Sequence, residues 1–221
     1  MKAKNERSVG GRGRRVDAAL AERRRRQILA AAGPFFAARG YRQADVQDLA
    51  DEIGVGKGTV YRYFPTKEEL FFAVVDDGIQ ALSDAVDRAI EEWEGTLDQI
   101  RLGVEAYLEF FDRRPEMVEL LIIERAEFRD REKTVYFLYR DRHQARREEM
   151  LQRAMDAGVL RRMPPARLTN VIGDMLYGVI FTNHFAGRRV PFREQANEIL
   201  DVLMGGILAD GALKQGRKET S

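Results

Sequence analysis

The chain has 221 residues, of which 44% are apolar and 33% charged, so it is long enough for one large or two modest domains with a real core. It contains no cysteine, which excludes disulfides, thiolate metal sites and cysteine nucleophiles and fits a reducing cytoplasm. No apolar run is long enough to span a membrane, and no apolar stretch follows the basic N-terminus, so we expect neither a transmembrane helix nor a secretory signal.

Charge is distributed unevenly along the chain. Residues 1–70 hold 15 Lys and Arg against 9 Asp and Glu, a net charge of +6, whereas the rest holds 22 against 27, a net charge of −5. A basic end on an acidic body is typical of a chain that presents one end to a polyanion.

The N-terminal segment, residues 1–16, is rich in Gly and Arg and has almost nothing apolar to bury, which predicts a disordered basic arm. Its arginines Arg12, Arg14 and Arg15 either contact phosphates or the DNA minor groove, or belong to a solvated tail without a role.

A first helix is expected from about Asp17 to Arg39, with a basic turn at 23–26 that is expected to face phosphates at its N-terminal end. Pro34 inside this helix predicts a kink or a local break near Ala30 to Pro34, because proline lacks the amide hydrogen that the helix needs.

The stretch from Asp45 to Leu70 predicts two short helices joined by a tight turn. Asp45 is a favourable N-cap, Gly54 ends the first helix, and a second helix begins near Gly56 and ends before Pro65. This is the spacing of a helix-turn-helix, whose second helix enters the DNA major groove. On spacing alone, an ordinary pair of surface helices fits equally well.

The residue types in this stretch suit DNA binding. Two glycines leave room for a phosphate, a lysine and a threonine lie where base edges are read, and two tyrosines and a second lysine can bind phosphates. A glutamine early in the first motif helix can pair bidentately with adenine. The predicted DNA-binding residues are Gln47, Gly56, Lys57, Gly58, Thr59, Tyr61, Tyr63 and Lys67.

The run from Arg26 to Leu70 closely resembles the tetracycline-repressor (TetR) family of bacterial transcription regulators. The matching positions are Ile28, Ala31, Phe36, Gly40-Tyr41, Leu49-Ala50, Gly54-Val55, Gly58-Thr59, Tyr61, Tyr63-Phe64, Lys67-Glu68 and Leu70. Two departures are Ala44-Asp45, where the family usually has hydroxylic residues, and Gly33-Pro34, where it has good helix formers. The resemblance implies a base or phosphate contact at the predicted DNA-binding positions.

Beyond Pro65 the periodicity predicts six more helices, at about 67–93, 96–113, 115–129, 134–157, 164–186 and 193–209, and no strand alternation is visible. The predicted class is all-α, with an N-terminal three-helix helix-turn-helix DNA-binding unit (17–66), a larger helical ligand-binding and dimerisation domain (67–211) and a disordered tail (212–221). The resemblance implies the same architecture. The helix from Lys67 to about Trp93 is expected to be the one continuous element that joins the two domains.

The middle helices carry many aromatic and methionine side chains, most of which are expected to pack in the core. The functional interpretation is a pocket for a small apolar or aromatic molecule, and the resemblance implies an inducer in this region. The residues predicted to line this pocket are Trp93, Tyr107, Phe110, Phe111, Met117, Tyr136, Phe137, His143, Met175 and Asn183.

The last two helices contain glycines in apolar surroundings, at 173, 178, 205 and 206, which favours close helix approach. The resemblance implies that these helices form a four-helix homodimer interface, although a buried contact within one chain fits the sequence equally well.

Enzyme chemistry has little support, because the two histidines lie outside any metal-ligand spacing and no catalytic motif is present. We expect no catalytic residues, metal or cofactor. The predicted function is a cytoplasmic, dimeric repressor that a small ligand releases from a palindromic double-stranded DNA operator, with no membrane partner. A helical scaffold that has lost DNA reading and a small helical enzyme are the alternatives.

Overall fold

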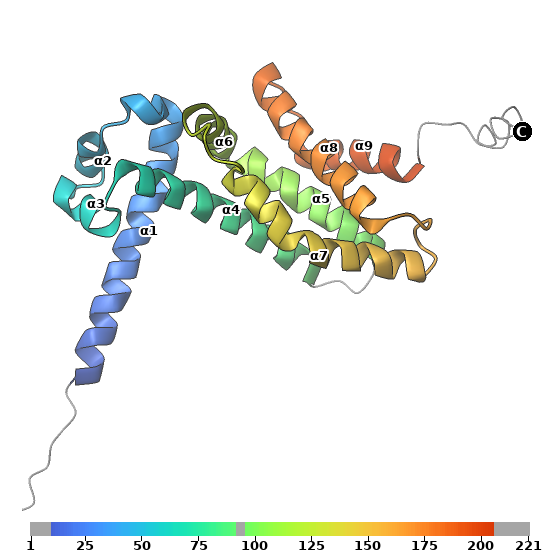
Figure 1. Ribbon diagram of the computed structural model, residues 1–221, viewed down its shortest axis with the longest axis horizontal. Coiled ribbons are helices and arrows are strands. Elements are labelled where there is room, and N and C mark those ends of the chain that lie inside the picture. The colour runs from blue at the N-terminus through green and yellow to red at the C-terminus, as the bar shows by residue number, and fades with distance from the viewer. Residues whose placement is uncertain (1–9, 92–95, 206–221) are drawn as a thin grey trace, which may run out of the picture. The chain divides into compact units, whose positions relative to one another are not determined.

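The computed structural model describes residues 10–91 and 96–205, and within these ranges it contains nine α-helices and no strand (Figure 1). This confirms the predicted all-α class. No helix in the described ranges is long and apolar enough to cross a membrane. The helices are α1 (Gly10–Gln43), α2 (Val46–Glu52), α3 (Lys57–Tyr63), α4 (Lys67–Glu91), α5 (Thr96–Arg113), α6 (Glu116–Glu127), α7 (Val135–Asp156), α8 (Pro165–Ala186) and α9 (Phe192–Gly205).

The first helix differs from its prediction at its beginning. α1 starts at Gly10, so the predicted disordered arm is helical from residue 10 onward, while residues 1–9 lie outside the described part of the chain. Its path changes at Gly40, which has φ 71° and ψ 163° and marks the predicted end of the regular helix. A positive φ of this size favours glycine because it has no Cβ.

The expected break before Pro34 is not present. Gly40 is the one residue of α1 whose dihedrals are not helical, and Pro34 lies exposed inside the continuous helix. A proline clashes with the Cβ and the amide of the residue before it when that residue is helical. Gly33 has no Cβ, so part of this clash is absent, and the helix continues at the cost of one hydrogen bond.

The chain forms two compact units whose limits fall inside helices. Unit 1 comprises the residues up to Gln80 together with Glu119–Tyr139, and unit 2 comprises Ala81–Val118 together with the residues from Arg140 on. Helices α4, α6 and α7 therefore each pass from one unit into the other. These limits differ from the predicted boundary at residue 66, and α6 and α7 pass between these units in addition to α4, the expected linking helix.

Unit 1 is built on the first four helices and has an apolar core. Ile28, Phe36, Leu49, Val60 and Phe71 have no exposed surface, so α1, α2, α3 and the start of α4 all contribute to one core. On α1, the side chains of Leu29, Ala32 and Phe35 are buried as well.

The segment 119–139 is fastened to the rest of unit 1 by aromatic and polar contacts. The ring of Phe128 lies 4.9 Å from that of Tyr41, 5.5 Å from that of Phe71 and 4.6 Å from that of Phe72, measured between centroids. An ion pair of 2.7 Å joins Arg42 Nε and a carboxylate oxygen of Glu127. These contacts place the end of α6 beside α1 and α4 within the same unit.

In unit 2, α5 packs against both α8 and α9, and the two other long helices, α4 and α7, are joined by polar contacts. Arg146 on α7 pairs with Asp87 on α4 at 2.9 Å. Arg140 on α7 pairs with Asp174 on α8 at 2.7 Å. A Cβ at Gly173 would lie 2.8 Å from the Arg140 guanidinium, so this glycine allows the Arg140 side chain of the same chain to approach α8 closely.

Candidate functional site

The predicted helix-turn-helix is present in unit 1 with the expected turn chemistry. The Asp45 carboxylate caps α2 by accepting a hydrogen bond of 2.8 Å from the Gln47 amide. Gly54, which was predicted to end the first motif helix, has φ 68°, in the left-handed region, and the Val55 amide then donates to the Ala50 carbonyl at 2.9 Å. Val55 is half-buried in the turn. Because these bonds are local, the residues 45–55 hold α2 and the start of α3 in a fixed relation.

The N-terminus of α3 is open and carries Lys57 at its first position. No described atom lies within 4 Å of a Cβ built at Gly56 or at Gly58, so the backbone here is accessible. Thr59 is half-buried, and its amide donates to the Gly56 carbonyl at 2.7 Å. Open backbone amides and a cation at a helix N-terminus suit an anionic ligand.

The polar side chains around this end are paired with acidic neighbours. Lys57 Nζ lies 3.1 Å from the Asp45 carboxylate, and this bond raises the pKa of Lys57. The pKa of Asp45 is lowered, mainly by the bond from the Gln47 amide and then by Lys57. The side-chain amide of Gln47 donates to Asp51 at 2.7 Å. To bind a nucleic acid, Lys57 and Gln47 would therefore have to leave these carboxylates and donate to acceptor atoms of the nucleic acid.

The remaining predicted DNA-binding side chains differ in how free they are. Tyr61 and Tyr63 are half-buried on α3. Lys67 donates to the Arg42 carbonyl at 3.2 Å, lies 4.8 Å from the Tyr41 ring centroid, and has a pKa that burial lowers. The Lys67 ammonium group thus already has partners within unit 1, and the sequence pattern did not indicate these contacts.

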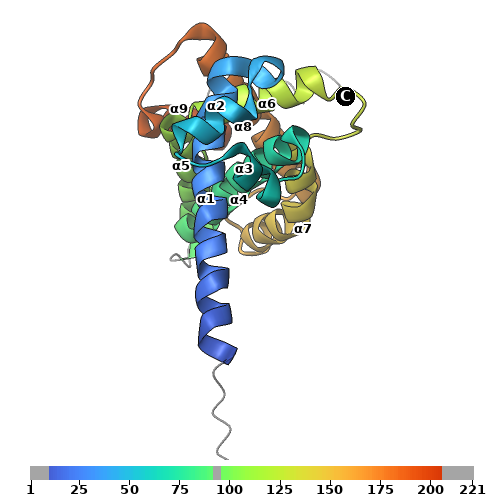
Figure 2. The same ribbon diagram turned by 90° about the vertical axis from the view of Figure 1, so that its left-hand side faces the viewer.

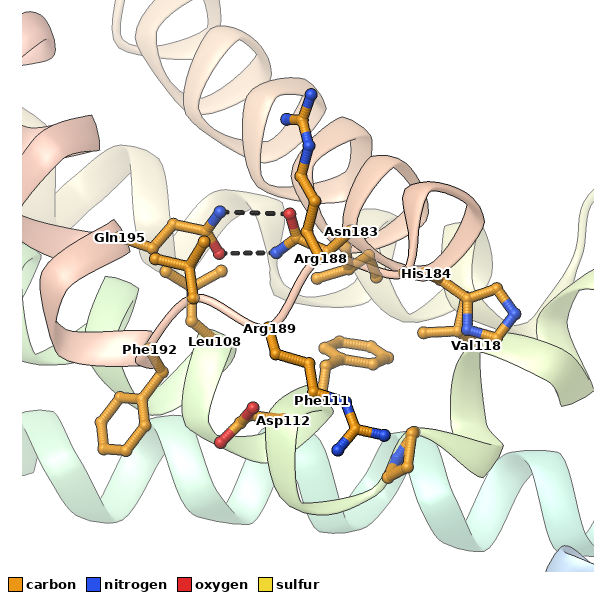
Figure 3. A pocket seen from close by; sticks show the side chains of 14 residues that line it. Leu108, Phe111, Asp112, Val118, Asn183, His184, Arg188, Arg189, Phe192 and Gln195 are labelled. Atoms are coloured by element: carbon orange, nitrogen blue, oxygen red, sulfur yellow. Dashed lines mark hydrogen bonds between the residues drawn. The ribbon is translucent and has the colours of Figure 1, made fainter.

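A cavity of about 520 Å³ lies in unit 2 between α5, the start of α6, and the end of α8 with its connection to α9 (Figure 3). Apolar side chains form much of its wall, and a group of polar and charged side chains forms the remainder. Its lining residues are Leu108, Phe111, Asp112, Pro115, Val118, Ile180, Asn183, His184, Gly187, Arg188, Arg189, Val190, Phe192 and Gln195.

The polar part of the cavity wall joins two helices. Asn183 on α8 and Gln195 on α9 exchange two amide hydrogen bonds, of 2.7 and 3.3 Å, and both residues are half-buried. In Figure 3 the side chain of Arg188 points away from Asp112, whereas that of Arg189 extends to the same side as Asp112. This part of the wall therefore combines the amide pair with the Arg189 side chain, which lies on the same side as Asp112.

The structure brings few of the predicted ligand-binding residues to this cavity. Phe111 and Asn183 line it. Tyr107, Phe110 and Met117 are buried core residues. The rest are spread elsewhere: Met175 and His143 are half-buried in unit 2, Tyr136 and Phe137 belong to unit 1, and Trp93 lies outside the described residues.

Several cavity residues were missed because they do not stand out in an apolar pattern. Arg188 and Arg189 lie in the connection after Gly187, and Gln195 lies on the first turns of α9. A pair of arginines directly after a helix-ending glycine resembles an ordinary solvated loop, so no sequence pattern singled them out. No group of three or more His, Asp or Glu suited to a metal occurs in the described residues.

Helices α8 and α9 expose large apolar side chains. Val171 is 51% exposed and Phe185 71% exposed on α8, and Val202 is 53% exposed on α9. A Cβ built at Gly178 or Gly205 would meet no described atom within 4 Å, unlike one at Gly173. Gly178 and Gly205 thus make no close approach within this chain, and Gly206 lies outside the described residues.

The N-terminal part of the chain matches a known family. Residues 28–74 match the model of bacterial regulatory proteins of the tetR family. A curated relative, the transcriptional activator FasR of Mycolicibacterium smegmatis, is 32% identical over 109 residues, which cover 49% of this chain and 50% of the relative. The nucleoid occlusion factor SlmA of Vibrio vulnificus is 31% identical over 114 residues, covering 49% and 58%. The chain spans about half the length of the curated relatives it matches.

Solved structures extend the likeness over most of the chain. The fatty acid degradation regulator FadR from Bacillus halodurans superposes with a TM-score of 0.72 at 18% identity, covering 83% of this chain and 95% of the other. At this identity the likeness shows the fold. The family match and the related sequences agree, and residues 28–74 of this chain belong to the tetR family of bacterial regulatory proteins.

Proposed function

We propose that the protein is a sequence-specific DNA-binding transcription regulator that reads a palindromic double-stranded operator. The observation that carries this proposal is the geometry of α2, the turn at Gly54 and α3, whose N-terminal backbone is open at Gly56 and Gly58. In a helix-turn-helix the second helix places its N-terminal residues against base edges in the major groove. The family match over residues 28–74 supports this interpretation of α2 and α3.

Within this proposal the predicted DNA-binding residues have different roles. Lys57 and Thr59 read base edges, since they occupy the first turn of α3. Tyr61 and Tyr63 position the DNA backbone, and Gln47 contacts an adjacent base after releasing Asp51. Lys67 reaches a phosphate only if it leaves the Arg42 carbonyl, so its part in binding is the smallest.

A palindromic operator requires a two-fold symmetric reader. The exposed apolar side chains of α8 and α9, with open space at Gly178 and Gly205, support a homodimer through these two helices. Such a dimer holds its two reading helices about 34–36 Å apart, or a multiple of one DNA turn, to enter successive major grooves.

The cavity in unit 2 is the proposed site of a small ligand that releases the protein from DNA, so that the protein acts as a repressor. The apolar side chains of Leu108, Phe111, Ile180 and Phe192 support a ligand with an apolar or aromatic body. Thermal shift with a panel of aromatic and aliphatic compounds tests this class. Stabilisation by small, multiply charged metabolites alone would exclude it.

Selection of bound sequences from random duplex DNA tests the proposed function. We expect a pseudo-palindrome to be enriched, and we expect Lys57→Ala to lose affinity and relax the preference at one position of each half-site. Arg162→Ala, an exposed change in unit 2, is the matched control and should select the same sequence as the wild type. Failure of the wild type to enrich any sequence refutes the proposal, and an unchanged operator with Lys57→Ala refutes the assignment of the reading residues.

A further inference from the structure

The first half of α1 extends beyond the packed part of unit 1. Every residue from 19 to 27 is exposed or half-buried, with Leu20 59% exposed, and the first buried residue after this stretch is Ile28. Figures 1 and 2 both show this part of α1 leading away from α2 and α3. At 1.5 Å per residue, the 18 residues from Gly10 to Gln27 form a helix of about 27 Å. We call residues 10–27 the α1 extension.

The N-terminal end of the chain is strongly basic. Residues 1–27 contain ten Lys and Arg against three Asp and Glu, a net charge of +7, whereas the whole chain carries +1. The rest of the chain therefore carries −6. Within the α1 extension, positions 12, 15, 23 and 26 fall on one side of a helix with 3.6 residues per turn, because a separation of 11 residues is close to three full turns.

Neighbouring groups neutralise only part of this charge. Arg26 pairs with Glu22 at 2.9 Å, and both side chains are largely exposed. Arg24 donates to Gln27 at 2.8 Å, and the Arg25 guanidinium lies 5.4 Å from the Phe64 ring centroid. Arg23 makes no ion pair or hydrogen bond with any described residue. Like charges at positions three and four apart destabilise an isolated helix, and residues 19–27 bury no side chain. A bound polyanion would therefore stabilise the helical form of this basic segment.

We propose that the α1 extension binds phosphates of duplex DNA outside the base pairs read by α3. This rests on the proposed function. The seven residues of α3 span about 10 Å, whereas the α1 extension is as long as about eight base pairs, at 3.4 Å per base pair along the duplex. A straight helix with a basic side therefore has room for several phosphates beyond one half-site. Its contribution is independent of sequence, because phosphates carry no base information.

The test compares two duplexes and three full-length proteins. One duplex holds the selected operator alone, and the other holds the operator with ten additional base pairs on each side. The proteins are the wild type, a variant of the α1 extension, and a control that loses the same charge in unit 2. The first variant carries Arg12→Gln, Arg15→Gln, Arg23→Gln and Arg26→Gln. The control carries Arg142→Gln, Arg161→Gln, Arg162→Gln and Arg193→Gln, all at exposed positions of unit 2.

The proposal predicts that the wild type and the control bind the longer duplex more tightly than the operator alone, and that the α1-extension variant does not. Each lost phosphate contact flattens the plot of log affinity against log salt by about 0.9. Two to four contacts in each protomer of a dimer then flatten the slope on the longer duplex by about 4 to 7 in the α1-extension variant. Circular dichroism should show that all three proteins remain helical.

The outcomes separate this inference from the proposed function. Equal salt slopes for the α1-extension variant and the control, or no gain from the added base pairs in the wild type, overturn the inference while specific binding to the operator stands. Loss of binding to anionic vesicles in the α1-extension variant, with DNA binding unchanged, would assign the charge to a membrane surface and also overturn it. Absence of any DNA binding in the wild type refutes both proposals.

Discussion

Replacement of Glu124 by Gln tests whether one buried carboxyl group makes the stability of this chain depend on pH. Glu124 lies on α6 and is 1% exposed. Its Oε1 accepts a hydrogen bond of 2.9 Å from the Val135 amide at the start of α7, and its Oε2 has no partner among the described residues. Burial raises the pKa of this carboxyl group above 4.5, while the Val135 bond and the charge of Arg131 partly oppose the rise.

The direction of the pH dependence follows from this raised pKa. The folded protein binds the Glu124 proton more tightly than the unfolded chain, so the stability contributed by this group is fully present below pH 4.5 and decreases as the pH rises through the folded pKa. Within that window the free energy of unfolding falls by up to about 1.4 kcal/mol per pH unit because of this group. Glu124→Gln keeps an oxygen that accepts from Val135 and removes the charge, so this part of the dependence should disappear.

The measurement is chemical unfolding at a fixed protein concentration, in steps of half a pH unit upward from the unfolded pKa. Glu132→Gln, an exposed acid between α6 and α7, is the control and should keep the slope of the wild type. Glu124→Leu leaves the Val135 amide unpaired and should be less stable than Glu124→Gln by about 1–3 kcal/mol at every pH. Equal pH slopes for the wild type and Glu124→Gln would refute the reasoning.

Three further changes test the proposed dimer, the cavity wall and the aromatic contacts at the end of α6. Phe185→Glu places a charge on the exposed face of α8 and should raise the dimer dissociation constant at least tenfold in sedimentation, whereas an unchanged constant would remove this face from the interface. Asn183→Leu breaks the bonds to Gln195 and should lower stability by about 1 kcal/mol, with Gln195→Leu adding less in that background than alone. Phe128→Ala should cost about 2 kcal/mol in chemical unfolding, less than a fully buried ring, and an unaltered midpoint would contradict its packing role.

The helix-turn-helix could be predicted from the sequence because local interactions determine it. The Asp45 cap, the positive φ at Gly54 and the stop before Pro65 each act over a few residues, and the observed ends of α2 and α3 lie within about a residue of the predicted ones. The observed ends of α5 and α8 also lie within about a residue of the predicted ones, and α8 ends at Gly187. Pro34 was misjudged because the effect of a proline depends on its neighbour, here a glycine.

The features that the sequence did not reveal depend on contacts between distant segments. The limits of the two units fall within α4, α6 and α7, where the helical period runs on without interruption. Lys67 looks like a free cation in the sequence, but Arg42, 25 residues earlier, supplies the carbonyl to which it donates. Tyr136 and Phe137 share the aromatic character of the other predicted ligand-binding residues, yet they belong to the other unit.

Helix α6 continues from the wall of the cavity in unit 2 into unit 1, so it is one route by which the proposed ligand would affect the proposed reading helices. Val118 lines the cavity in unit 2, and Glu119, the next residue of the same helix, already belongs to unit 1. Less than two turns later along α6, Glu124 accepts a hydrogen bond from the Val135 amide at the start of α7. Phe128, directly after α6, packs on Tyr41 of α1. A ligand changes operator affinity only if it binds two arrangements of the protein unequally. Because α4, α6 and α7 each continue from one unit into the other, we expect that a change at one position of α4, such as the buried Gly78, weakens the coupling without interrupting α6.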